Sequence, residues 1–99
     1  MLIIYKYNAI IMVIMEKPNI DELVVWVKDG KYRIKILRVL EKDKLISSEI
    51  AQKINNHRST TSRILKNLKD KQLITSINAG SRTIMYFITD LGKEVLKTV

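Results

Sequence analysis

The chain has 99 residues and a mass of 11.5 kDa, which is enough for one domain with one hydrophobic core. Hydrophobic residues make up 46% of it, a share typical of folded proteins. A net charge of +8 favours a polyanionic partner, with nucleic acid ahead of an anionic membrane surface. There is no cysteine and only one histidine, so disulfides, thiolate metal sites and histidine-based triads are not expected. These absences argue against an enzyme and predict neither a metal nor a cofactor.

The first fifteen residues form an apolar segment, interrupted only by Lys6 and Asn8. It is shorter than the ~20 residues of a membrane span and lacks a signal-peptide cleavage site, so we expect a cytoplasmic protein without a membrane anchor. Three interpretations remain open. The segment packs on the domain or on a second copy of the chain, it lies upstream of a biological start at Met12 or Met15, or, as the weakest alternative, it touches a membrane surface.

A first helix is predicted to begin after Pro18 and to end at Asp29. Its apolar stripe follows the i, i+3, i+4, i+7 spacing of a helix packed on one side, with Ile20, Leu23, Val24 and Val27. Trp26 lies off this stripe, and we interpret it as a core or interface aromatic rather than a ligand-binding residue. Residues 1–30 are therefore predicted to form an N-terminal extension and helix with a role in dimerisation.

Further elements are predicted at residues 32–41 (helix), 45–46 (short strand), 48–54 (helix) and 58–71 (helix). Either Ser47 or Ser48 is expected to cap the third helix. Asn55 and Asn56 end it, because asparagine tolerates the left-handed backbone of a sharp turn. The turn to the fourth helix is thus only three or four residues long.

Two strand-like runs follow, residues 73–77 and 82–88, around a glycine-containing tip at residues 78–81, which predicts a β-hairpin. Thr89 is expected to cap a last helix, residues 90–97. The predicted fold class is α+β and mainly α. Its 31–99 domain holds three core helices and a hairpin, with a C-terminal helix after them.

Positive charge is concentrated in the middle of the sequence. Residues 1–49 carry nine Lys and Arg against seven acids, whereas residues 50–89 carry seven against one, Asp70. No acid occurs in residues 50–69. A solvated lysine-rich face is the plain interpretation, but in this structural context a binding surface is the better one.

Two helices joined by so tight a turn cross steeply, and the second projects one face outward. This is the helix-turn-helix arrangement, whose projecting helix fits the major groove of B-DNA. The exposed side chains expected to contact DNA from the fourth helix are Arg58, Ser59, Thr60, Ser62, Arg63 and Lys66. The hairpin would act as a wing and reach the minor groove, where negative potential attracts arginine. The residues expected to contact DNA from its tip are Asn78, Ser81 and Arg82.

The run from residue 49 to residue 74 resembles, without gaps, the winged helix-turn-helix of prokaryotic MarR/ArsR-type regulators. The matching residues are Glu49, Ile50, Ala51, Gln52, Lys53, Ile54, Arg58, Ser59, Thr60, Ser62, Arg63, Ile64, Leu65, Lys66, Asn67, Leu68, Leu73 and Ile74. Residues 86–93 resemble that family's Y-x-L-T-x-x-G entry into the last helix. The resemblance implies that the helix from Arg58 reads DNA, that Arg82 serves the wing, and that the working unit is a homodimer on a pseudo-palindromic site.

Some positions depart from the family pattern. Asn55 and Gln72 stand where the family usually has glycine, and Asn56 stands at a usually apolar position. His57 replaces the usual Ser or Thr cap, so the cap is expected to shift to Asn56. Thr61 replaces a usual valine, and its buried hydroxyl must find a backbone partner.

The leading hypothesis is a sequence-specific regulator that binds double-stranded DNA, acting as a repressor. The alternative is a winged-helix module that binds protein in a transcription or replication complex. RNA binding is a third hypothesis, although the face lacks aromatic platforms for single strands. No feature identifies a small-molecule effector. The Lys- and Ile-rich composition is typical of a thermophilic, AT-rich prokaryote or its virus, and we expect an archaeal source.

Overall fold

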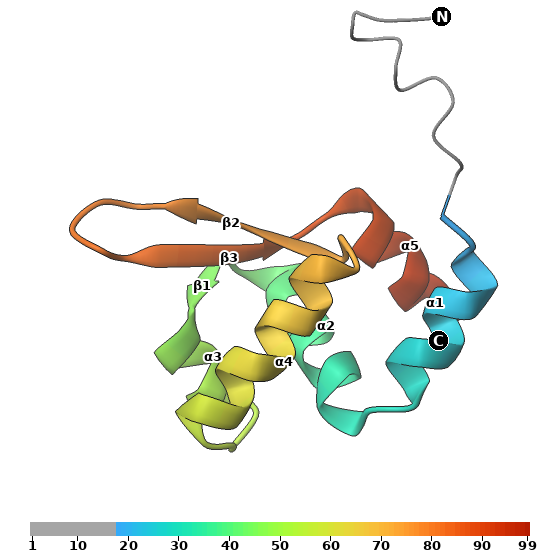
Figure 1. Ribbon diagram of the computed structural model, residues 1–99, viewed down its shortest axis with the longest axis horizontal. Helices are drawn as coiled ribbons and strands as arrows, with labels where there is room; N and C mark the ends of the chain where they lie inside the picture. Colours follow the sequence, from blue (N-terminus) through green and yellow to red (C-terminus); the bar gives the residue numbers. More distant parts are fainter. Residues whose placement is uncertain (1–17) are drawn as a thin grey trace, which may run out of the picture.

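The computed structural model describes residues 18–99; the predictions made for residues 1–15 lie outside this range. The elements, in chain order, are α1 (Ile20–Lys28), α2 (Lys31–Lys42), β1 (Leu45–Ile46), α3 (Ser47–Lys53), α4 (Arg58–Asp70), β2 (Ile74–Asn78), β3 (Ile84–Ile88) and α5 (Asp90–Thr98). Figure 1 shows the hairpin of β2 and β3 extending to one end of the molecule, with α1 and α5 at the other. The arrangement confirms the predicted mainly helical α+β class with a winged helix-turn-helix.

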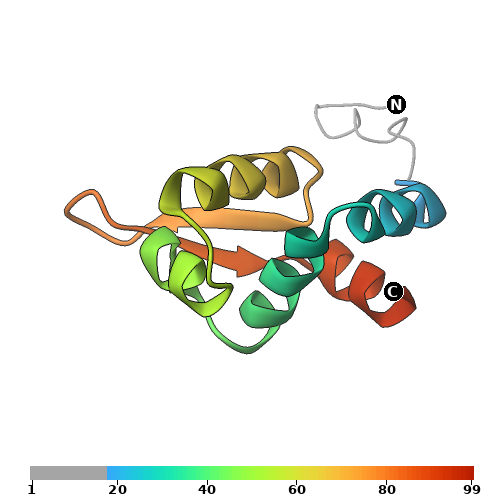
Figure 2. The ribbon, with the colours of Figure 1, turned by 90° about the horizontal axis from the view of Figure 1, so that it is seen from below.

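The three strands form an antiparallel sheet in the order β1-β3-β2. Leu45 lies opposite Tyr86, and Ile74 lies opposite Ile88, so these four side chains share one face of the sheet. Helices α2, α3 and α4 cover that face, and in Figure 2 they lie in front of the sheet. The other face carries Ile46, Thr75, Ile77, Met85 and Phe87. No helix of the described part covers it in Figure 1, and Ile77 is 49% exposed.

One hydrophobic core joins all the helices and the sheet. Helix α4 contributes Thr61, Leu65 and Leu68 at helical spacing, and all three are fully buried. Helix α1 contributes Val24 and Val27, which belong to the same core. The core side chains are Val24, Val27, Ile36, Leu37, Leu40, Leu45, Ile50, Ile54, Leu65, Leu68, Leu73, Ile74, Ile88, Val95 and Leu96. The face of α4 opposite its buried stripe is therefore held outward by the packing of the domain.

Trp26 packs at the corner between α1 and α2, which agrees with its interpretation as a packing residue. The Arg33 guanidinium lies 3.9 Å from the centre of the Trp26 ring and donates a hydrogen bond to the Trp26 carbonyl. The ammonium of Lys71, just beyond α4, lies 5.4 Å from the same ring. This cluster ties the end of α4 to α1.

The predicted helix caps are partly wrong. Ser47 and Ser48 lie inside α3, whose N-cap is Ile46, and the Glu49 carboxylate accepts the Ile46 N–H at 3.1 Å. The sheet explains this, because pairing of Ile46 with β3 lets the helix begin directly after the strand. His57, not Asn56, is the N-cap of α4, and the Asn56 side chain accepts only the neighbouring His57 N–H, at 2.8 Å.

Other local predictions are confirmed. The Thr61 hydroxyl donates to the His57 carbonyl at 2.8 Å, which supplies the backbone partner that its burial requires. Asn55 has φ 56°, the left-handed conformation expected of the turn. Thr89 caps α5 by accepting the Gly92 N–H at 3.0 Å.

The predicted start of the return strand is wrong. The strand was predicted from residue 82, but β3 begins at Ile84, because Arg82 has φ 67° and belongs to the loop.

Candidate nucleic-acid interface

The outward face of α4 presents the side chains that the sequence placed there. Arg58, Ser59, Ser62, Arg63 and Lys66 are exposed; Thr60 is half-buried. The opposite stripe of the helix lies in the core, so rotating α4 would remove apolar residues from the interior. The face is thus fixed in direction and open to a large ligand.

The electrostatics of this face are dominated by unpaired cations. Within residues 18–99 the only ion pair joins Lys66 to Asp70, at 3.6 Å and with both side chains well exposed. An exposed i,i+4 pair of this kind contributes only a few tenths of a kcal/mol and opens readily to another anion. Neither Arg58 nor Arg63 has a carboxylate partner in that part of the chain.

The wing tip is held by its own backbone. Gly80, Ser81 and Arg82 all have positive φ, at 96°, 40° and 67°. The Ala79 N–H donates to the Thr83 carbonyl at 2.7 Å, and the Asn78 side-chain oxygen accepts the Gly80 N–H at 3.0 Å. Asn78 therefore builds the turn with its oxygen, whereas Ser81 and Arg82 are exposed at the tip.

The structure brings Arg58 and Arg82 together, although they are 24 positions apart in the sequence. Both line a cavity of about 230 Å³, together with Ser47, Ser48 and Thr83. Sequence reasoning missed these three hydroxyl residues as part of the site. The two serines were interpreted as helix caps, and only the pairing of β1 with β3 shows that they face the wing. Arg63 and Lys66 do not line this cavity; they lie further along α4.

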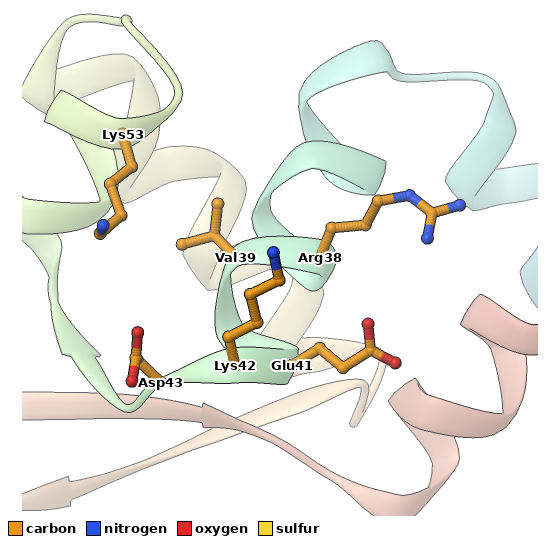
Figure 3. A pocket seen from close by; sticks show the side chains of 6 residues that line it. All are labelled: Arg38, Val39, Glu41, Lys42, Asp43 and Lys53. Carbon is orange, nitrogen blue, oxygen red and sulfur yellow. The ribbon is translucent and has the colours of Figure 1, made fainter.

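A second cavity differs in character. It has a volume of about 490 Å³ and lies between α2, the turn after it and α3. Its lining mixes cations and carboxylates: Arg38, Val39, Glu41, Lys42, Asp43 and Lys53. Figure 3 shows Arg38 and Lys53 on opposite sides of it, on α2 and α3. The mixed charges make it a poorer match for a polyanion than the acid-free cavity beside the wing.

In residues 18–99 no three His, Asp or Glu side chains gather where they could hold a metal ion. Over the same residues, no helix is long and apolar enough to cross a membrane.

Comparison with known proteins agrees with this geometry. The model of the family described as "Bacterial regulatory protein, arsR family" matches residues 30–76, just under half of the chain. The match covers α2, β1, the helix-turn-helix and the first part of the wing. By its description, that family consists of regulatory proteins. No curated protein sequence matches the chain.

Several solved structures are similar. Lactococcus lactis ZitR aligns at 24% identity with a TM-score of 0.66, over 70% of this chain and 49% of that one. S. aureus MepR in complex with DNA aligns at 22% identity with a TM-score of 0.69, over 79% and 67% of the two chains. HlyU from Vibrio cholerae aligns at 22% identity with a TM-score of 0.66, over 85% and 89%. The chain thus has the winged helix-turn-helix fold and spans about half the length of ZitR.

Proposed function

We propose that this winged helix-turn-helix chain is a sequence-specific transcription regulator that binds double-stranded DNA as a homodimer and acts as a repressor. Helix α4 lies in the major groove, and the wing lies at the adjacent minor groove. The residues proposed to contact DNA are Arg58, Ser59, Thr60, Ser62, Arg63, Lys66, Asn78, Ser81 and Arg82.

One observation carries the proposal: the acid-free run of residues 50–69 includes a tight turn and an outward helix face whose arginines have no carboxylate partner among residues 18–99. Arginine binds the O6 and N7 atoms of guanine with two hydrogen bonds, serine and threonine bond bases or phosphates, and lysine neutralises phosphate. The similarity to MepR, whose structure was determined in complex with DNA, adds support from a protein of the same fold.

The dimer is proposed to form at the end of the molecule opposite the wing. Helices α1 and α5 pack against each other there, as Figure 1 shows. Val25 of α1 is 67% exposed, so it offers an apolar side chain to a second copy of the chain. We place the dimer seam on α1 and α5, with the apolar residues from position 2 onward as a further contribution.

Selection from a random DNA library with the purified full chain, at two salt concentrations, tests the function. We expect enrichment of inverted repeats whose half-sites lie about one helical turn apart. Affinity should fall steeply with salt, with a log–log slope of about −0.9 for each phosphate neutralised.

The variant Arg63→Ala should then lose on the order of 1–3 kcal/mol of binding free energy on the selected site and should relax base preference at one position. Arg38→Ala, which removes the same side chain from the cavity of Figure 3, is the matched control. Absence of any enriched sequence at either salt concentration would favour a protein-binding module instead.

A further inference from the structure

The cavity between the helix-turn-helix and the wing has a lining that is unusual for a surface hollow. Arginine side chains enter it from two separate elements, Arg58 from α4 and Arg82 from the wing loop. Three hydroxyl residues, Ser47, Ser48 and Thr83, complete its polar lining, and Ile46, Ile84 and Tyr86 provide the rest. Among residues 18–99, no carboxylate lines it. From sequence, the two arginines are predicted only as separate contacts to DNA.

The guanidinium groups of Arg58 and Arg82 and the hydroxyls of Ser47, Ser48 and Thr83 have no partners among residues 18–99. Over residues 18–99, neither guanidinium makes an ion pair, and neither donates a hydrogen bond. The hydroxyls of Ser47, Ser48 and Thr83 likewise make no hydrogen bond there. The nearest acid along the chain, Glu49, is engaged by the Ile46 N–H. Two cations facing one cavity repel each other, so an anion between them would be stabilised by both.

The wing loop, which carries Arg82 to this cavity, has a strained backbone. Arg82 and Ser81 both have left-handed φ values, of 67° and 40°, without being glycine. Each such residue costs on the order of 1 kcal/mol, and strain of this kind is often retained at functional sites. The Thr83 N–H donates to the Gly80 carbonyl at 2.7 Å, which closes the loop in this form.

We propose that this cavity binds one backbone phosphate of bound DNA between Arg58 and Arg82. The hydroxyls of Ser47, Ser48 and Thr83 donate hydrogen bonds to this phosphate. We call this binding site the phosphate seat. The inference rests on the proposed function. The planar guanidinium fork matches a pair of phosphate oxygens, and hydroxyl donors fill the remaining acceptor positions.

The seat lies at the junction of the two DNA-contacting parts, between the first turn of α4 and the wing. A phosphate held here would set how far α4 enters the major groove and where the wing meets the strand that borders the minor groove. Phosphate contacts fix register and carry no base information. Arg58 is therefore a positioning residue, whereas Arg63, outside the cavity, is left to read bases.

The salt dependence of DNA affinity tests the role of Arg58. For Arg58→Ala we expect the same fractional loss of affinity on the selected site and on unrelated duplexes. The log–log salt slope should become shallower by at most about 0.9 for each protomer, because Arg82 still faces the same phosphate, so the disadvantage of the variant should shrink as salt rises. Arg58→Lys keeps the charge and should keep the slope. An unchanged slope in Arg58→Ala, or a loss confined to one base position, overturns the proposal.

The hydroxyls need a separate variant because they are uncharged. Ser47→Ala combined with Ser48→Ala should weaken binding several-fold on every duplex without changing the salt slope. Arg63→Ala is the contrast, because its loss should depend on sequence. If Arg63→Ala is sequence-selective while the serine variant binds DNA like the unchanged chain, the seat fails and the proposed function stands. If the unchanged chain has no affinity for DNA, both fail.

A free phosphate ion has the same chemistry as the proposed occupant. Titration of inorganic phosphate into the DNA-free protein, followed by the amide NMR signals of Ser47, Ser48 and Thr83, separates the two sources. We expect saturation only at tens of millimolar or above, because a lone ion lacks the rest of the duplex. Saturation below about 1 mM would assign the seat to a free anion and overturn the assignment to DNA.

Discussion

Two residues other than glycine with a left-handed backbone lie on either side of α4. Asn55 ends α3 with φ 56°, and Gln72 follows α4 with φ 64°. Asparagine reaches the left-handed region at little cost, but glutamine does not. Helix α4 is thus followed by a strained position, and the strained residue is exposed rather than buried in the core.

Replacing Gln72 with glycine should relieve this strain. We expect the free energy of unfolding to rise by about 1 kcal/mol, which is the left-handed penalty less the extra chain entropy of glycine in the unfolded state. Asn55→Gly is the matched control and should change it by a few tenths of a kcal/mol at most. Urea denaturation of the three proteins measures both values. A larger gain for Asn55→Gly would contradict the strain argument.

Gly92 is required for space rather than for backbone freedom. A Cβ atom at this position would overlap the Leu73 carbonyl oxygen and lie 2.7 Å from Ile88 Cγ1. Gly92→Ala should therefore cost about 2 kcal/mol or more, because a backbone carbonyl cannot move aside like a flexible side chain. A Cβ atom at Gly80 would have no neighbour within 4 Å. Gly80→Ala should therefore lower the free energy of unfolding only by the left-handed penalty of about 1 kcal/mol, since φ is 96°. Thermal unfolding compares the two; equal losses would show that crowding at Gly92 is relieved by a helix shift.

At the scale of elements, Thr89 joins three of them. Its hydroxyl lies 2.8 Å from the Gln72 carbonyl and 3.0 Å from the Leu73 carbonyl, and it accepts the Gly92 N–H. One side chain thus links the end of α4 and the base of the wing to the first turn of α5. We therefore expect this link to help set the angle between α4 and the wing.

Removal of that hydroxyl should loosen the wing and destabilise the domain. We expect Thr89→Val to lower the free energy of unfolding by about 1–2 kcal/mol, because the cap of α5 and the hydroxyl's contacts with the Gln72 and Leu73 carbonyls are lost, and to weaken DNA binding. Thr89→Ser keeps the hydroxyl and should retain most of both. Denaturation and DNA titration give the two readouts. If Thr89→Val is as stable as the unchanged chain, the hydroxyl is not needed to hold the wing, and the sheet alone sets the wing angle.

The sequence predicted these elements well where local chemistry decides them. Helical spacing located α1, α2 and α4 within one or two residues, and the Thr89 cap followed from the residue type alone. The cap of α3 was predicted wrongly, because tertiary pairing decides it. Ile46 pairs with β3 and becomes the N-cap in place of Ser47 or Ser48. The cavity lined by Arg58 and Arg82 depends on the same non-local pairing. Its two arginines could therefore be predicted from the sequence, but its three hydroxyl residues could not.

At the scale of the whole molecule, the wing and the paired helices lie apart. The wing lies at one end, and helices α1 and α5 lie at the other, as Figure 1 shows; the cavity lined by Arg58 and Arg82 is beside the wing. This division suits a dimer whose seam is remote from DNA and whose two wings point outward. The spacing of the two recognition helices would then be set by the seam and not by the DNA-contacting residues.

A charge placed in the proposed seam tests this arrangement. Val25→Glu should not unfold the chain, because the side chain is 67% exposed, but it should bury a carboxylate in a dimer and so drive the equilibrium toward monomer. Gln52→Glu, which adds the same charge to an exposed position on α3, is the control. Light scattering after gel filtration measures the mass. A monomer that binds a half-site should lose affinity for the inverted repeat by a factor of ten or more, because the second half-site contact no longer benefits from effective concentration. If Val25→Glu stays dimeric and binds the repeat fully, the seam lies elsewhere, and the outer sheet face with Ile77 and Met85 becomes the next apolar surface to test.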